Sequence, residues 1–251
     1  MEIISVNEKN LVQYPPLCFI NPKNEGSIKK IEWVREQLPL GLKIKLLYLE
    51  NTKKCNGYIE YIRGENAWRA VNASGYTFIH CIWISPNKYK EQGYATRLLE
   101  TCLKDARENN QYGVAVVTSE GSFMTGEALF SKNGFKTIAR AEPSYQLMVK
   151  TFREGSLPYF KDWQKRLAGY QGWHLVYSRQ CPWVARSISE LMDVAQKHAI
   201  NLNVTELKTP QEAQNAPSVY AVFNLIYNGQ ILADHYISTR RFENLIKKVL
   251  Q

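Results

Sequence analysis

The chain has 251 residues, of which 45% are hydrophobic, and a formal net charge of +9. This length allows two modest domains with separate cores, and no apolar run is long enough for a membrane span or a secretion signal. The basic residues are spread along the chain without a Lys/Arg tract, so we expect a cytoplasmic protein that binds neither membrane nor nucleic acid.

The cysteines argue against a disulfide framework and against a metal site. They form no CxxC pair and no Cys/His cluster at metal-ligand spacing, and their number is odd. We therefore expect no metal and a reducing compartment. The five are Cys18, Cys55, Cys81, Cys102 and Cys181.

The first 62 residues predict strands around one helix. Residues 1–6 form a short apolar run, and residues 27–38 place apolar side chains at helical spacing before Pro39 and Gly41, which end the helix. Two strand-like runs, 42–49 and 57–62, are separated by the polar residues 51–54 and predict a hairpin.

A short segment after the hairpin has two interpretations. Trp68 could form the flat wall of an acceptor pocket, with Arg69 gripping a carboxylate beside Glu65. Alternatively, Trp68 caps the core and Arg69 pairs with Glu65 at the surface, and this structural interpretation is slightly favoured.

The chain is organised around residues 77–107, which predict a buried strand, a tight loop and a helix. Thr77 to Ile84 is nearly all apolar or β-branched, and apolar residues recur at helical spacing from Leu98. At the start of a helix, amide N–H groups lack partners, and Gly93 lets a ligand approach them closely. This loop therefore predicts an anion site, most often a phosphate site.

Two motifs resemble those of the GNAT acetyltransferase superfamily. Lys90-Glu91-Gln92-Gly93-Tyr94-Ala95 is similar to its phosphate-loop signature, with Lys in place of Arg or Gln, and residues 127–135 are similar to its second signature, after a strand at 114–118. The resemblance implies acetyl-CoA as cosubstrate. It also implies that main-chain groups of Ile82 and Ile84 hold pantetheine, and that the phosphate loop holds the diphosphate through Lys90, Gln92, Gly93, Tyr94, Ala95 and Thr96.

The catalytic groups are less well matched to this family. GNAT enzymes often have a Glu or His base four residues before the last residue of this strand, and counting back from Ile84 gives His80. Cys81 takes that place if the register slips by one. A buried histidine with a purely structural role would fit the sequence equally well. Phe130 stands where the family commonly has a Tyr that protonates the thiolate. Ser131, Tyr94, Tyr145 or solvent would have to replace it.

The remainder predicts two closing strands, 136–140 and 145–149, a linker with a short helix over 159–167, and a second domain. From residue 173 the pattern is βαβ followed by ββα, which resembles the thioredoxin fold of YoaP-like proteins. Cys181 precedes a helix, where a thiol gains thiolate character. Val184 replaces the resolving cysteine, so a monothiol role, a ligand-binding role and a structural role all stay open.

Together these patterns predict an α/β (α+β) protein of two domains. Residues 1–150 would form a GNAT-type domain with a mixed, mostly antiparallel sheet flanked by helices, residues 151–172 a linker, and residues 173–251 a smaller thioredoxin-like domain. The expected activity is acetyl transfer from acetyl-CoA to a small-molecule or peptide amine. The alternative is a non-catalytic acyl-CoA-binding or thiol-sensing module. The oligomeric state is not indicated by the sequence.

Overall fold

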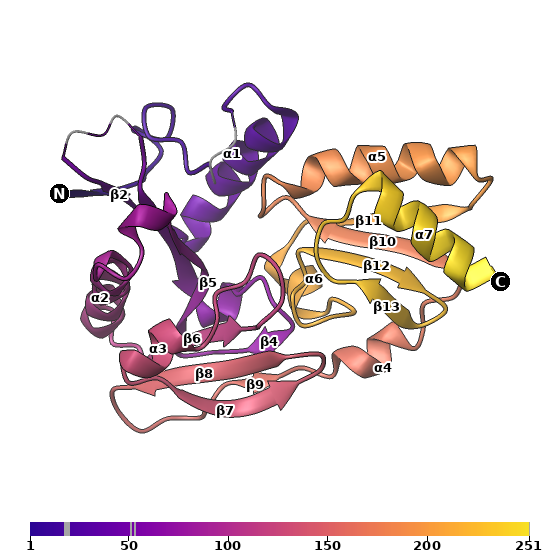
Figure 1. Ribbon diagram of the computed structural model, residues 1–251. Helices are drawn as coiled ribbons and strands as arrows, with labels where there is room; N and C mark the ends of the chain where they lie inside the picture. The colour runs from indigo at the N-terminus through magenta and orange to yellow at the C-terminus, as the bar shows by residue number, and fades with distance from the viewer. Residues whose placement is uncertain (18–20, 51, 53, 251) are drawn as a thin grey trace. The chain divides into compact units, whose positions relative to one another are not determined.

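The structure is a computed structural model that describes residues 1–17, 21–50, 52 and 54–250 (Figure 1). Cys18 and two residues of the predicted hairpin turn, Asn51 and Lys53, lie outside the described residues. Backbone contacts divide the chain into two units, each built from separate stretches of sequence. The first unit is Met1–Pro16, Val34–Ala67 and Val71–Phe160, and the second is Leu17–Trp33, Trp68–Ala70 and Lys161–Gln251.

The first unit contains a seven-stranded sheet in the order β1-β2-β3-β5-β6-β8-β7. Only the β5–β6 pair is parallel, so the predicted mixed, mostly antiparallel sheet is confirmed. A separate two-stranded pair joins β4 to β9. The strands are β1 (Glu2–Ser5), β2 (Lys43–Tyr48), β3 (Gly57–Arg63), β4 (Val71–Asn72), β5 (Tyr76–Ile84), β6 (Gly113–Thr118), β7 (Lys136–Ala141), β8 (Tyr145–Thr151) and β9 (Tyr159–Phe160).

Helix α2 (Tyr94–Glu108) covers one face of this sheet because its apolar side chains recur every three or four residues. Five of them are buried in a core that also contains side chains of β3, β5 and β6: Leu98, Leu99, Cys102, Leu103 and Ala106. Helix α3 (Ala128–Lys132) adds Phe130 to the same core. Helix α1 (Glu25–Gln37) is divided between the units after Trp33, and three short 3-10 turns span Leu38–Leu40, Gly64–Asn66 and Asn87–Tyr89.

A polar contact fixes the far end of α2 to the sheet. The carboxylate of Asp105 accepts a hydrogen bond from the Tyr61 hydroxyl at 2.5 Å, and lies 3.2 Å from Lys43 Nζ and 3.4 Å from Lys45 Nζ. Burial acts to raise the pKa of Asp105, but the Tyr61 hydrogen bond and the two lysines outweigh it, so the pKa is lowered. Asp105 therefore remains ionised at neutral pH and holds α2 in place.

The second unit has a four-stranded sheet in the order β11-β10-β12-β13, with β10 parallel to β11 and antiparallel to β12. Its elements follow the predicted βαβ and ββα order. Helices α5 and α7 lie side by side along this sheet (Figure 1). The elements are α4 (Trp163–Leu167), β10 (Trp173–Ser178), α5 (Val184–Lys197), β11 (Leu202–Leu207), α6 (Pro210–Gln214), β12 (Phe223–Tyr227), β13 (Gln230–Ala233) and α7 (Thr239–Leu250).

The helix predicted over residues 159–167 forms only in its second half. Tyr159 and Phe160 are instead paired as β9 with Asn72 and Val71. Helix α4 begins after Asp162, whose side chain accepts a hydrogen bond from the amide of Lys165 at 3.2 Å and so caps it. Among the described residues, no helix combines the length and apolar character that crossing a membrane requires.

Candidate functional site

The central feature of the first unit is a gap between two parallel strands. The β5–β6 ladder runs from the pair Tyr76 and Gly113 to the pair Ile79 and Val116, while β5 continues to Ile84 and β6 to Thr118. Beyond Ile79 the edge of β5 that faces β6 therefore carries main-chain groups outside this ladder. One of them, the Ile82 carbonyl, accepts a hydrogen bond from the Thr125 hydroxyl at 3.0 Å.

The loop after β5 leads into the N-terminus of α2. Gly93 is the N-cap residue, with a φ of 81° and no side-chain cap, and the first helical amide bonded to a carbonyl is that of Arg97, at 3.0 Å from the Gly93 oxygen. The amide groups before Arg97 therefore remain available, as expected for the first turn of a helix. A Cβ added to Gly93 would meet no atom within 4 Å, so this end of the helix faces open space.

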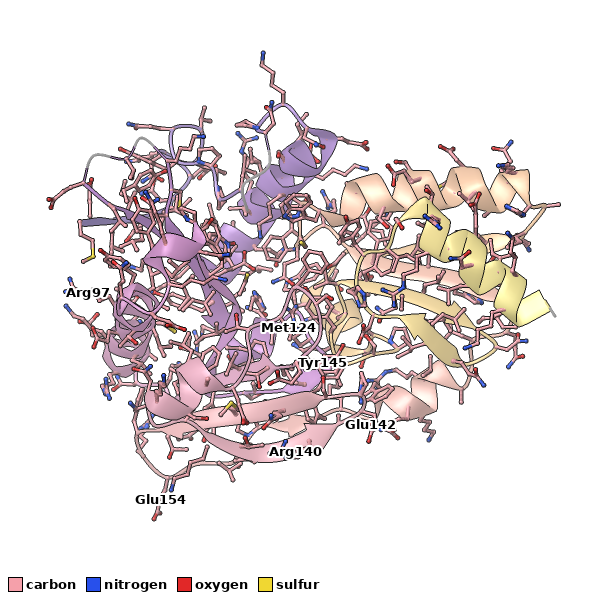
Figure 2. The ribbon with its side chains drawn as sticks, in the orientation of Figure 1. Arg97, Met124, Arg140, Glu142, Tyr145 and Glu154 are labelled. Atoms are coloured by element: carbon pink, nitrogen blue, oxygen red, sulfur yellow. The ribbon has the colours of Figure 1, made fainter. Side chains whose placement is uncertain are left out.

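The structure brings the predicted phosphate-loop residues together at this helix end. Lys90, Gln92 and Gly93 are exposed, while Tyr94, Ala95 and Thr96 are half-buried in the first turn. The exposed Arg97 points away from the sheet in Figure 2. Lysine side chains and unpartnered amides at one helix terminus create a positive potential suited to an anion.

Phe130, which stands where the family commonly has a tyrosine, is part of the core of the first unit. Phe130 is fully buried and packs edge-to-face on Phe135 at 5.3 Å between ring centroids. Of the three hydroxyls considered as replacements, Ser131 is exposed, Tyr145 is buried, and Tyr94 packs edge-to-face on Tyr89. In Figure 2, Tyr145 lies at the start of β8. The next residue, Gln146, pairs with Thr118, the last residue of β6.

Thr118, at the end of β6, is a candidate that sequence reasoning missed. Its side chain is fully buried, and its hydroxyl has no hydrogen-bond partner among the residues that the structure describes. It alternates with Val114 and Val116, which belong to the core under α2 and α3, so it lies on the same face of β6 as they do. In the sequence Thr118 is one more β-branched strand residue, and no signal there distinguishes it.

His80 lies at a bulge in β5, where the pairing with β3 shifts register. Its imidazole is fully buried, with Nδ1 3.2 Å from Oε1 of Glu60, and Oε2 of Glu60 accepts a hydrogen bond from the Tyr58 hydroxyl. An ionised Glu60 would accept a hydrogen bond from Nδ1–H of His80, and in this tautomer Nε2 is the basic nitrogen. Glu60 was not predicted, because glutamate in a strand reads as a solvent-facing residue.

The three residues considered for an acceptor pocket belong to different units of the chain. Trp68 and Arg69 are buried in the second unit, where Arg69 donates hydrogen bonds to the Trp68 carbonyl and to Gln180, both at 2.6 Å. Glu65 is an exposed residue of the first unit whose carboxylate accepts a hydrogen bond from the amide of Gly75 at 2.8 Å. A shared pocket of these residues therefore stays a prediction.

Cys181 lies in the turn before α5, and it is half-buried and not in a disulfide. The amide of Val184 donates to the Cys181 carbonyl at 3.2 Å, and Val184 itself is buried where a second thiol would stand. The described residues contain no group of three or more His, Cys, Asp or Glu side chains that could hold a metal ion.

Comparisons with known proteins agree with both halves of this description. Residues 13–135 match the model of the acetyltransferase (GNAT) family, and residues 201–244 match the YoaP-like model. The chain is 26% identical over 249 residues to the "Uncharacterized N-acetyltransferase YoaP" of Bacillus subtilis (strain 168), covering 97% of each chain.

Similar solved structures cover about three-fifths of the chain. A GNAT-family acetyltransferase from Staphylococcus aureus Mu50 is 18% identical, with a TM-score of 0.45, and covers 61% of this chain and 99% of its own. The PaiA N-acetyltransferase of Thermoplasma acidophilum, in complex with coenzyme A, is 15% identical, with a TM-score of 0.44, and covers 61% and 100%.

Proposed function

We propose that this protein transfers an acetyl group from acetyl-CoA to an amine, because residues 13–135 match the GNAT acetyltransferase family model and residues 201–244 match the YoaP-like model. The observation that carries this proposal is the open N-terminus of α2 beside the gap between β5 and β6. A diphosphate needs several donors directed at one place, and the first-turn amides supply them.

The residues around this gap fit the coenzyme. Gly93 leaves space for a phosphate against the main chain, and Lys90 adds positive charge at the same loop. Main-chain groups of Ile82 and Ile84 would pair with the amides of the pantetheine arm, with the Thr125 hydroxyl giving up its bond to Ile82. Acetyl-CoA supplies the activated acetyl group, and the chain supplies its position and the proton transfers.

Two side chains on opposite faces of the sheet would assist the reaction, one by accepting a proton and the other by donating a hydrogen bond. His80, held by Glu60, would take the proton that the attacking amine loses, once the bound amine has opened access to the imidazole. Thr118 would donate a hydrogen bond toward the sulfur atom, the role for which Phe130 has no hydroxyl. The acceptor would be a small-molecule or peptide amine in the cytoplasm.

Isothermal titration calorimetry tests the coenzyme site directly. The wild type should release heat on titration with acetyl-CoA, and Gly93→Glu should abolish binding because its carboxylate would repel the diphosphate. Ser156→Glu, at an exposed position outside the site, is the matched charge control and should bind as the wild type does. No heat with the wild type, or unchanged binding with Gly93→Glu, would overturn the proposal.

A non-catalytic acyl-CoA-binding module is the alternative that Phe130 favours, since its place in the motif lacks a proton donor. The two functions separate in an assay of free thiol release from acetyl-CoA against a panel of amines. Steady release with at least one amine supports the transferase. Tight acetyl-CoA binding without release above the rate of spontaneous hydrolysis supports the binding module.

A further inference from the structure

The second unit contains a small cavity that the acetyl-transfer site does not use. It has a volume of about 10 Å³, which is about the space that one water molecule needs. Its lining comes from the turn before α5, the end of β10 and the start of α1. The residues that matter for its chemistry are Ser178, Cys181, Arg179, Tyr177, Lys29 and Gly26.

Close packing of α1 on the cysteine turn keeps the cavity small. A Cβ added to Gly26 would lie 2.0 Å from the carbonyl oxygen of Pro182, so only glycine allows this approach. Val184 and Ala185, both buried at the start of α5, close the apolar side. The site therefore has room for only a very small molecule beside Cys181.

Ser178 is a buried polar residue in the lining of the cavity. It is 1% exposed, and its hydroxyl has no hydrogen-bond partner within the described part of the chain. A buried hydroxyl without a partner is unfavourable, and most such groups in proteins are satisfied by a ligand or an ordered water. Ser178 and Cys181 line the same cavity, so a ligand held by the serine would lie close to the cysteine.

The charges around the cavity are already compensated, which disfavours a multiply charged anion. Arg179 pairs with Glu206 at 2.7 Å and with Glu32 at 3.6 Å, and Lys29 pairs with Glu25 at 2.7 Å. Burial and the nearby Glu206 raise the pKa of Tyr177 to about 12, so its hydroxyl stays neutral. A small uncharged molecule suits this lining best.

We propose that this cavity binds hydrogen peroxide and that Cys181 is oxidised there to a sulfenic acid. The Cys181 thiolate attacks one peroxide oxygen, so that the S–O bond forms as the O–O bond breaks. The sulfur loses two electrons to the peroxide, and the departing hydroxide takes the proton that the thiol released and leaves as water. The Ser178 hydroxyl hydrogen-bonds to the peroxide.

Other cysteines of the same chain provide internal comparisons. Burial raises the pKa of the Cys55 thiol to about 11, and the thiol of Cys102, which is fully buried, also has a raised pKa. Both therefore stay protonated at neutral pH, and a protonated thiol reacts slowly with peroxide. Val184 offers no thiol to condense with the sulfenic acid, so the oxidised state should persist until an external thiol reduces it.

The test is dimedone labelling of the full chain, first reduced and then treated with graded hydrogen peroxide at pH 7.5. Peptide mass spectrometry should find Cys181 labelled at least tenfold faster than Cys55 and Cys102. Ser178→Ala should slow this labelling at least fivefold, while Ser156→Ala, at an exposed serine, should leave it unchanged. The rate of Cys181 alkylation by iodoacetamide should stay within twofold in both variants, which shows that the thiol itself is unaltered.

A second measurement tests the size of the cavity. Relative to a free cysteine in solution, Cys181 should react at least tenfold less efficiently with tert-butyl hydroperoxide than with hydrogen peroxide. Labelling of Cys181 no faster than that of Cys55, or equal relative rates with the two peroxides, would overturn the proposal. A Ser178→Ala variant that is oxidised like the wild type would overturn it as well.

Discussion

Gly93 is the position where the coenzyme site can be tested with the least disturbance of the fold. Its φ of 81° lies in the left-handed region, where an L-residue costs about 1–2 kcal/mol, and an added Cβ would meet no atom within 4 Å. Gly93→Ala should therefore lower the free energy of unfolding by about 1–2 kcal/mol, without a steric clash in the free protein.

The effect on binding should exceed this effect on folding. A Cβ at Gly93 would stand between the first-turn amides of α2 and a bound diphosphate, which should remove at least one hydrogen bond to a charged group. Such a bond is worth about 1.5–3 kcal/mol, so the Kd for acetyl-CoA should rise roughly 10-fold to 100-fold.

Gly41 is the matched control because it has a φ of 92°, lies in the first unit and has no atom closer than 4.0 Å to an added Cβ. Urea unfolding should show a similar loss of stability for Gly41→Ala and Gly93→Ala. Calorimetry should show weaker binding for Gly93→Ala alone. Equal acetyl-CoA affinity in both variants would refute a diphosphate site at this helix end.

Three further predictions concern single side chains. Thr118→Val should lower the rate of acetyl transfer about tenfold without lowering the Tm, because the lost hydroxyl has no partner in the free protein; a full rate in the thiol-release assay would exclude Thr118 as a donor. His80→Gln should lower kcat roughly 100-fold at pH 7 while the Kd for acetyl-CoA stays within twofold; an equal loss of affinity would assign His80 a structural role. Burial raises the pKa of Cys55 to about 11, so iodoacetamide should alkylate it roughly 100-fold more slowly at pH 8 than an ordinary cysteine. The rate, measured by mass spectrometry of the Cys55 peptide, should rise about tenfold with each pH unit up to pH 11. A rate that levels off already at pH 9 would contradict the raised pKa.

The apolar pattern predicted the elements around the site well, because buried strands and helices place apolar residues at regular intervals in the sequence. The run from Thr77 predicted β5, which the structure begins one residue earlier, and the spacing from Leu98 predicted the buried face of α2. The paired strands β4 and β9 have two residues each, too few for any period, so Tyr159 and Phe160 were assigned to a helix.

The parts of the site that depend on partners could not be predicted in the same way. A sequence pattern shows that a residue is buried, but it does not show which group that residue contacts. The pairing of Glu60 with His80 joins neighbouring strands at a bulge, and the unpartnered hydroxyl of Thr118 depends on where the β5–β6 ladder ends. The roles assigned to the phosphate-loop residues and to His80 remain predictions for the experiments above.

The division of the chain between its two units affects how the protein can be made and cut. The second unit contains both Leu17–Trp33 and Lys161–Gln251, and most of the first unit is synthesised between these two segments. The earlier segment, which includes Gly26 of the cavity beside Cys181, therefore lacks its later partners until they have been translated. For the same reason, a C-terminal fragment expressed alone would lack part of that cavity, and limited proteolysis between the units would not release two complete halves.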